Sequence, residues 1–275
     1  MKLHYSASPE QTNTMSTEQL RDTYLIQNIF RPGEIVAHYT DLDRMIILGA
    51  QPAPAAPLKL GNYKHTGTTY FLERREIGIL NIGAKPGTIT VADTKHTLGH
   101  LDCLYVGLGE KDITFEGDTQ FYCISTPAHA KYPTALLRGD AIKTPPIGDS
   151  ANANRRVIRR YIHQKEGGIK SCQLVMGCTT LDTGSIWNTM PAHTHTRRTE
   201  IYLYFDIPQD QMVVHLLGEP HRTRHVIVHD REVVLSPSWS IHSGAGTAAY
   251  RFVWAMGGDN QLFEDMDPVA IADMR

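Results

Sequence analysis

The sequence lacks the features that would send a protein into or across a membrane. No apolar run approaches the about 20 residues that a membrane-spanning helix needs. The first residues, MKLHYSASPEQTNTMS, lack the apolar core of a signal peptide. The four cysteines form no CxxC pair and lie mostly in apolar, strand-like text. Cysteines in such positions are typical of reduced thiols that pack in the core. We therefore expect a cytoplasmic protein that does not bind membranes.

An excess of charge of one sign is also missing. Lysine and arginine total 27 and aspartate and glutamate total 29, so the net charge is −2, and the basic residues form no long run. This balance argues against nucleic acid or an anionic membrane surface as a partner. Hydrophobic residues make up 41% of the 275 residues, which is enough for one large all-β unit or two small domains that share a core.

Helix signals are few. Ser16 and Gln19 form a capping-box pattern within the stretch STEQLRDTYLIQNIF, which predicts one short helix near the N-terminus. Elsewhere the text consists of short β-like runs, such as GEIVAHYT, GTITVAD, QFYCIST and EIYLYFDI, separated by Gly, Pro and Asp. Many short strands with turn residues between them predict an antiparallel sandwich or barrel, and hence an all-β fold.

A weak internal repeat divides the chain. The stretch ERREIGILNIG (73–83) resembles RRTEIYLYFDI (197–207), and this alignment puts Glu76 opposite Glu200. The repeat is either accidental or the mark of two β-barrel halves. In the second case the halves are joined around 138–156, which is rich in Pro, Gly and Asn.

Histidine is what the chain has in quantity, with 14 copies, and the strongest functional signal lies in WNTMPAHTHTRRTEIYLYF. Alternate side chains of a strand share a face, so His193 and His195 point the same way, and Glu200 follows after a short connection. A third histidine, His242, follows a Ser–Pro turn in VLSPSWSIHSGAGT. Three imidazoles and a carboxylate suit a divalent transition metal. The alternative, histidines that only pack or form hydrogen bonds, does not account for this spacing.

We expect the two halves of the chain to differ in this site. Residues 1–145 are assigned to an N-terminal barrel without a metal, and 146–275 to a C-terminal barrel with one. The first-half positions that match the ligands hold side chains that cannot build the same site, namely Thr69, Phe71 and Val106 or Gly107.

The HxH pair, the glutamate and the later histidine are similar to the metal signature of the cupin (double-stranded β-helix) barrels. Longer stretches resemble the 5-keto-4-deoxyuronate isomerase family: YFLERREIGILNIG, NRRVIRRYI, IWNTMPAHTHTRRTEIYLYF, SPSWSIHSGAGT and WAMGGDNQLFEDMD. The likeness runs from about residue 17 to the C-terminal DMR. It implies two tandem cupin barrels, with one Zn²⁺ per subunit in the second barrel and a cytoplasmic homohexamer. The zinc ligands that it implies are His193, His195, Glu200 and His242.

The resemblance also implies an activity in pectin breakdown, the conversion of 5-dehydro-4-deoxy-D-glucuronate into 3-deoxy-D-glycero-2,5-hexodiulosonate. This is an intramolecular oxidoreductase reaction that turns an aldose into a ketose. The carbonyl moves from C1 to C2 through an enediolate, whose negative charge a Lewis-acid metal stabilises. The residues do not identify the catalytic base.

The substrate is a uronate, and its carboxylate calls for a guanidinium partner. Strand parity puts Arg198 on the face of Glu200, so Arg198 is our candidate for binding the substrate carboxylate. An equal alternative is that Arg198 pairs with an acidic residue of the protein and has a structural role. Arg156 and Arg197 are next in line, although we assign the linker arginine Arg156 first to holding the linker. Tyr202 and Tyr204 share this face as well, either as a proton donor and a pocket wall or only as packing residues.

Two other functions use the same signature. A cupin dioxygenase often binds Fe(II) with three histidines and one glutamate. Iron with oxygen uptake would indicate that enzyme, whereas zinc with activity under nitrogen would indicate the isomerase. A non-catalytic sugar-acid-binding cupin would not need four intact ligands, so their presence argues against it.

Overall fold

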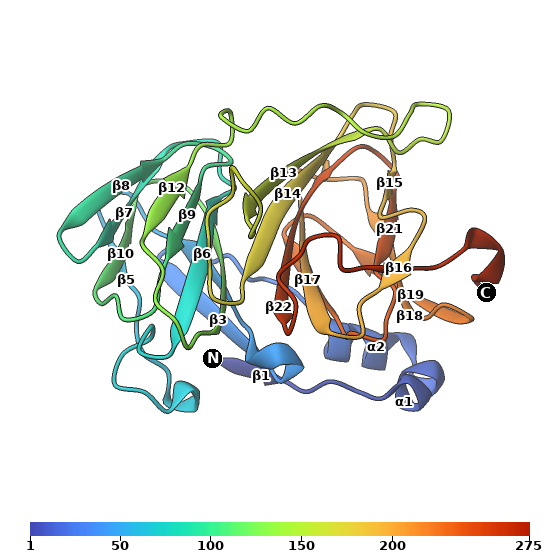
Figure 1. The fold of residues 1–275 in the computed structure, drawn as a ribbon, viewed down its shortest axis with the longest axis horizontal. Coiled ribbons are helices and arrows are strands. Elements are labelled where there is room, and N and C mark those ends of the chain that lie inside the picture. The colour runs from blue at the N-terminus through green and yellow to red at the C-terminus, as the bar shows by residue number, and fades with distance from the viewer. The chain divides into compact units, whose positions relative to one another are not determined.

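The computed structural model describes residues 1–275, and nearly all of its regular structure is β-strand, which confirms the all-β prediction (Figure 1). Two helices lie near the N-terminus where one was predicted, α1 (Pro9–Thr14) and α2 (Thr17–Tyr24). The capping box predicted at Ser16 and Gln19 starts α2, and a second box starts α1. None of the helices has the length and hydropathy that crossing a bilayer requires.

The chain forms two compact units. The first unit consists of residues 1–4, 29–143 and 160–176. The second unit consists of residues 5–28, 144–159 and 177–275. The junction at 143–144 lies close to the boundary expected at residue 145. The units differ from the expected ranges in two segments: 5–28 belongs to the second unit and 160–176 to the first.

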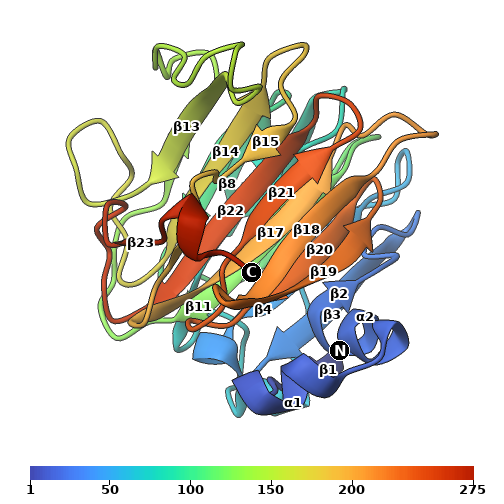
Figure 2. The same cartoon turned by 90° about the vertical axis from the view of Figure 1, so that its right-hand side faces the viewer.

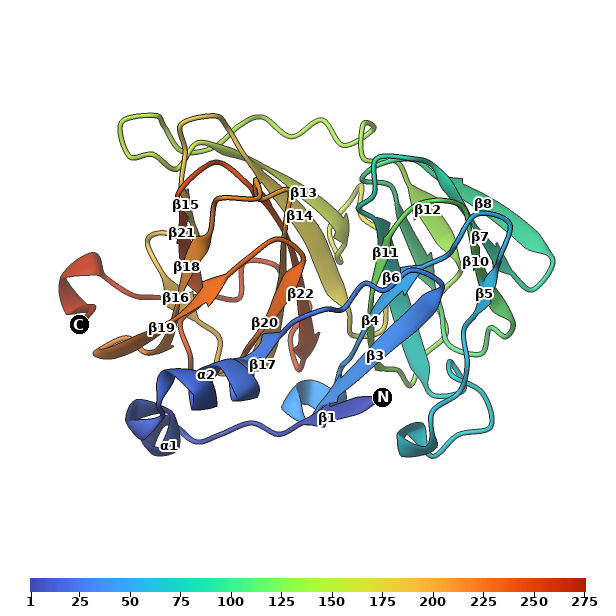
Figure 3. The ribbon, with the colours of Figure 1, turned by 180° about the vertical axis from the view of Figure 1, so that it is seen from behind.

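Strand pairing and hydrogen bonds keep the N-terminal segment with the second unit. β2 (Leu25–Ile26) pairs antiparallel with β20 (Glu232–Ser236). Figure 3 shows α1 and α2 beside β19 (Arg222–Val228). The guanidinium of Arg224 in β19 donates to three main-chain carbonyls at 2.7–3.0 Å, those of Thr12, Asn13 and Met15.

A buried carboxylate keeps residues 160–176 with the first unit. Glu76 is fully buried, and its side chain accepts hydrogen bonds of 2.7 Å from three successive main-chain N–H groups, those of Cys172, Gln173 and Leu174. Gly78, two residues further along the same face, lies so close to this segment that a Cβ there would be 2.7 Å from the Met176 sulfur. Glu76 therefore faces the 160–176 segment.

The first unit consists of two sheets around an apolar core. The larger sheet has the order β1 (Lys2–His4), β3 (Glu34–Thr40), β4 (Ile46–Gln51), β11 (Phe121–Pro127), β6 (Arg75–Asn81), β9 (Cys103–Val106) and β12 (Ala135–Leu137). The smaller sheet has the order β5 (Leu58–Lys59), β10 (Ile113–Glu116), β7 (Gly87–Val91) and β8 (Thr94–Leu98). Ile77 and Ile79 from the larger sheet share the core with Ile89 and Phe115 from the smaller one.

The second unit is built on the same plan (Figure 2). Its larger sheet has six strands in the order β13 (Arg156–Ile162), β14 (Val175–Leu181), β22 (Arg251–Gly258), β17 (Arg198–Phe205), β20 and β2, and residues 160–162 of β13 and 175–176 of β14 are those that belong to the first unit. A four-stranded sheet has the order β15 (Trp187–Asn188), β21 (Ser243–Gly246), β18 (Val213–Glu219) and β19. β16 (His193–Thr194) pairs with β23 (Asp267–Pro268), so the C-terminal segment adjoins the HxH motif. The short 3-10 turns are η1 (Leu42–Arg44), η2 (Lys64–Thr66) and η3 (Ile271–Asp273).

Candidate metal centre

The three histidines and the glutamate singled out in the sequence come together in the second unit. His193 lies in β16 and His195 directly follows it, while Glu200 lies in β17 and His242 directly precedes β21. His193 Nε2 lies 3.2 Å from His195 Nε2 and 3.0 Å from His242 Nε2. Glu200 Oε2 lies 2.8 Å from His195 Nε2 and 3.0 Å from His242 Nε2. The four donor atoms therefore form a closed ring.

The ring fits a divalent cation. Two ligands each about 2.1 Å from one ion are about 3.0 Å apart at a right angle and about 3.4 Å apart at the tetrahedral angle, and neighbouring donors here are 2.8–3.2 Å apart. All four lie within 4.8 Å of one another. Imidazole nitrogens and a carboxylate oxygen are the donors that zinc and other transition metals prefer. The residues present therefore fit the metal that the signature implies.

The outer nitrogens of two histidines have partners that orient the rings. The Nδ1 of His195 lies 2.7 Å from the main-chain oxygen of Asp265, and the Nδ1 of His242 lies 3.3 Å from that of Ser240. A carbonyl can only accept, so each Nδ1 carries a proton, and Nε2 is the nitrogen that a neutral ring offers to a metal. Such partners fix the tautomer that a metal requires.

Electrostatics favours the metal-binding forms of His193 and Glu200. Burial, with a contribution from His242, lowers the pKa of His193 to about 2, so its imidazole is neutral at neutral pH. Burial would raise the pKa of Glu200, but His242 and His195 outweigh it through charge and hydrogen bonds and hold that pKa well below its usual range. Neutral imidazole and ionised carboxylate are the forms that bind metals.

Arg198, the candidate for the substrate carboxylate, holds the C-terminal segment instead of facing an acid. It is 1% exposed, and its two Nη atoms donate to main-chain carbonyls at 2.7–3.2 Å, those of Asn260, Leu262, Phe263 and Asp265. The Asp265 carbonyl also contacts His195, so Arg198 fixes a group that orients a metal ligand. These contacts agree with a structural role, while a role toward substrate stays a prediction.

The two arginines next in line differ from each other. Arg197 is paired at the surface with two carboxylates, those of Asp265 and Asp267. Arg156 in β13 is half-buried, donates one N–H to the Asn154 carbonyl at 2.7 Å and forms no ion pair. Burial lowers the pKa of Arg156, and its charge interacts with the hydroxyls of Tyr202 and Tyr250, which belong to the same aromatic cluster. A half-buried guanidinium without a carboxylate is free to bind an anionic ligand.

Polar residues that the sequence analysis did not single out lie beside the ligands. His215 in β18 is fully buried, and its ring lies 5.8 Å from that of Tyr202, which lies 5.5 Å from that of His242. Asn188 in β15 is also fully buried and contacts the tyrosine hydroxyls of the same interior. In the sequence each is a lone polar residue in a short strand, so only the alternation of strand faces could have pointed to them.

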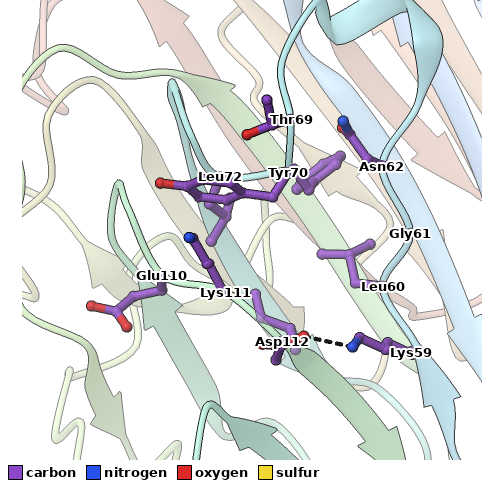
Figure 4. Close-up of a pocket in the computed structure, with 12 residues that line it drawn as sticks. Lys59, Leu60, Gly61, Asn62, Thr69, Tyr70, Leu72, Glu110, Lys111 and Asp112 are labelled. Carbon is purple, nitrogen blue, oxygen red and sulfur yellow. Dashed lines mark ion pairs between the residues drawn. The ribbon is translucent and has the colours of Figure 1, made fainter.

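The first unit has a pocket in which two lysines already have partners (Figure 4). The pocket has a volume of about 420 Å³. The Lys111 ammonium lies 4.6 Å from the centre of the Tyr70 ring, and Lys59 forms an ion pair of 2.5 Å with Asp112. Phe71, one of the residues aligned with the metal ligands, is part of the apolar core. The group of residues that could hold a metal ion lies in the second unit.

The chain has a cupin-like fold with a group of four residues that could hold a metal ion. Solved structures support this fold. One is an IolB-like protein from Salmonella typhimurium LT2, with a TM-score of 0.65, 15% identity and coverage of 79% of this chain and 84% of that chain. Another is an oxalate decarboxylase from Bacillus subtilis, with a TM-score of 0.53, 11% identity and coverage of 79% and 70%.

The chain belongs to the KduI/IolB family, which matches residues 53–271. It is 62% identical over 280 residues to a 4-deoxy-L-threo-5-hexosulose-uronate ketol-isomerase of Opitutus terrae, with all of both chains covered. A protein of the same name from Escherichia coli O127:H6 is 43% identical over 281 residues, again with full coverage of both. These matches confirm the family resemblance found in the sequence.

Proposed function

We propose that the protein is a zinc-dependent ketol-isomerase that converts 5-dehydro-4-deoxy-D-glucuronate into 3-deoxy-D-glycero-2,5-hexodiulosonate during polyuronate breakdown. One observation carries the proposal. The closed ring of three imidazoles and one carboxylate occurs in a chain whose full-length relatives, at 62% and 43% identity, are named as ketol-isomerases of this sugar acid. The ring supplies the site, and the relatives supply the substrate class.

The reaction moves protons and leaves the electron count of the substrate unchanged. A proton leaves C2 and a proton arrives at C1, while the hydroxyl proton moves from O2 to O1. A divalent ion held by His193, His195, Glu200 and His242 would supply Lewis-acid polarisation of the substrate carbonyl. Zinc is the ion we propose because it is redox-silent and takes nitrogen and oxygen donors. The chain holds these donors in place through the carbonyls of Asp265 and Ser240.

The substrate carboxylate needs a second anchor, for which Arg198 and Arg156 are the candidates. Arg198 was selected from strand parity, but both of its Nη atoms donate to carbonyls. Arg156 uses one N–H for Asn154 and has no acidic partner. The contacts therefore favour Arg156 for the carboxylate, with Arg198 keeping the metal-side loop in place. A bidentate guanidinium contact would orient C1 and C2.

We extend the proposal to assembly and location. The family resemblance implies a cytoplasmic homohexamer of tandem cupin barrels with one zinc per subunit. The four cysteines are free and three are buried, which supports a reducing compartment. Light scattering of the native protein should give a mass six times that of the 30.8 kDa chain. A monomer in solution would refute the assembly and leave the activity to be judged separately.

The activity is tested on the purified protein with 5-dehydro-4-deoxy-D-glucuronate under nitrogen. We expect about one zinc per chain by elemental analysis, ketose formation without oxygen, loss of turnover after chelation and recovery with added zinc. Bound iron together with oxygen uptake would instead establish the dioxygenase alternative. Failure of the zinc-loaded protein to form the ketose would overturn the proposed function.

A further inference from the structure

His215 is a buried histidine with one nitrogen bonded and one nitrogen unused. It is 0% exposed and lies on β18, where its neighbours Val214 and Leu216 are partly exposed, so its side chain faces the interior. Its Nδ1 lies 2.7 Å from the hydroxyl of Tyr204. Its Nε2 has no hydrogen-bond partner in the structure. A buried nitrogen without a partner is costly, so its retention in this interior points to a ligand.

The surrounding hydrogen bonds fix the position of the proton on this imidazole. The carbonyls of Ile186 (3.1 Å) and Gly244 (3.2 Å) are the acceptors for the single proton of the Tyr250 hydroxyl, so the Asn188 atom 2.6 Å from that hydroxyl must be the donating Nδ2. The same Nδ2 lies 3.3 Å from the Tyr204 hydroxyl and donates there too.

Tyr204 therefore accepts from Asn188 and has one proton of its own to give. The acceptor next to that proton is the Nδ1 of His215, 2.7 Å away. Since Nδ1 accepts, the neutral ring carries its proton on Nε2. The network thus holds an N–H donor, and not a bare lone pair, toward the interior. Burial lowers the pKa of His215 to about 3, which agrees with a neutral ring.

This N–H shares its surroundings with the metal ligands. His215 pairs across the sheet with Gly244, two residues after His242. The Tyr202 ring neighbours both histidines, 5.8 Å from the ring of His215 and 5.5 Å from that of His242. A Cβ at Gly244 would lie only 2.7 Å from Asn188 Nδ2 and 2.8 Å from the Tyr204 hydroxyl, so the glycine leaves room for the network.

We propose that His215 is the catalytic residue that carries the hydroxyl proton between O2 and O1 of the substrate, with Tyr204 and Asn188 as its positioning residues. This inference rests on the proposed isomerase function. As C1=O1 becomes a single bond, Nε2–H gives its proton to O1. The lone pair left on Nε2 takes the proton of the O2 hydroxyl as C2=O2 forms. With the carbon-bound proton moved from C2 to C1, every atom is accounted for and no oxidant or reductant is needed.

The test compares His215→Gln with His225→Gln in the zinc-loaded enzyme. Glutamine keeps an N–H donor but cannot relay a proton, and His225 is an exposed histidine on the neighbouring strand β19. We expect His215→Gln to lower kcat about 10²- to 10⁴-fold, the usual range for loss of a proton-transfer group. KM and zinc content should stay within about twofold of wild type, since the side chain neither binds the carboxylate nor ligates the ion. His225→Gln should behave as wild type.

Two further measurements separate proton transfer from a structural role. In D₂O, His215→Gln should still exchange the C2 hydrogen of recovered substrate with solvent while product formation falls, because only the oxygen-proton step is lost. Tyr204→Phe should lower kcat about tenfold with zinc unchanged, because the ring is no longer held in one tautomer.

The inference is overturned if His215→Gln keeps wild-type kcat, loses zinc together with activity, or loses C2 exchange in parallel with turnover. An unchanged rate in Tyr204→Phe would overturn the assigned tautomer. Wild-type enzyme that fails to convert the uronate would refute the proposed function itself, so the two failures are distinguishable.

Discussion

Glu76 and Glu200 lie near the starts of two similar strands, β6 and β17, yet they have opposite roles. Glu76 accepts hydrogen bonds from three main-chain N–H groups of the 160–176 segment and from the hydroxyls of Tyr105 and Thr126. Glu200 contacts the metal-side nitrogens of two histidines. One carboxylate ties a segment to its unit, and the other belongs to the candidate metal centre.

The side chains on the two strands explain this difference. In β6, Ile77 and Ile79 enter the apolar core, so Glu76 takes the other face. In β17, Glu200 shares its face with Tyr202, whose ring contacts that of His242. The sequence repeat aligned the two glutamates. The residues that face the interior are shifted by one position between the two strands, so the two glutamates lie on opposite faces of their sheets. Two units built on the same plan therefore differ in chemistry because of side-chain parity.

The largest effect is expected from removing a ligand of the second unit. His242→Ala should abolish turnover, a loss of at least about 10⁴-fold, because the ion loses one of its four protein ligands. Circular dichroism should show the β-fold retained, since the apolar strands around the site do not depend on the ion. Initial rates and zinc content check this, with exposed His225→Ala as the matched control. Near-wild-type activity with metal still bound would make the metal structural.

The second effect tests the first unit. Glu76→Gln should lower the free energy of unfolding by about 2–4 kcal/mol, because charge-assisted hydrogen bonds are lost and one buried acceptor becomes a donor facing N–H groups. Urea denaturation measures this. Zinc content and kcat of the folded variant should match wild type. Loss of zinc with unchanged stability would show that Glu76 serves the metal centre.

The third effect separates two arginines. Arg156→Lys should raise KM for the uronate about 10- to 100-fold with zinc unchanged, because an ammonium lacks the planar fork that binds a carboxylate bidentately. Arg198→Lys should instead weaken zinc binding, because the carbonyl contacts that position Asp265 next to His195 are lost.

A neutral sugar with the same carbonyl end is the control for both arginine variants. Arg156→Lys should leave its slow turnover unchanged, since no carboxylate is present to lose a partner. If Arg198→Lys raised KM for the uronate and spared both zinc and the neutral sugar, Arg198 would be the anchor and Arg156 would not.

The sequence predicted that these four candidate ligands come together because its signal is local. His193, His195 and Glu200 lie on one short stretch, where strand alternation alone brings them to one side, and His242 follows a recognisable turn. The short strands with Gly and Pro between them predicted the all-β fold for the same reason. Such patterns need only the neighbouring residues.

Contacts between distant parts of the chain could not be predicted. Strand parity placed Arg198 on the face of Glu200, but its guanidinium donates hydrogen bonds to main-chain carbonyls more than 60 residues away, in the C-terminal segment. The hydrogen bonds of Glu76 span 96–98 residues to the 160–176 segment. His215 is one polar residue in the apolar run MVVHLLG, where only the fold shows which nitrogen lacks a partner.

The smallest effect concerns histidines of the first unit that have no metal role. His4 Nε2 lies 2.9 Å from His38 Nδ1, and both are buried. Burial lowers the pKa of each from 6.5 to about 4, with Lys2 adding to the shift at His4 and the neighbouring His4 adding to it at His38. The folded state thus resists protonation of this pair, while the unfolded chain takes up protons below pH 6.5.

The sign of the pH dependence follows from these lowered values. The pair's contribution to stability is fully present above pH 6.5 and is lost as the pH falls from 6.5 toward 4, by up to about 1.4 kcal/mol per pH unit for each histidine. His38→Gln removes one titrating group, so its urea midpoint should fall less steeply than that of wild type between pH 7 and 5. Both proteins are measured free of zinc, because the metal ligands of the second unit also titrate and metal binding adds its own pH dependence. Parallel curves for the two proteins would show that the first-unit pair does not set acid stability and would leave the histidines of the second unit as its source.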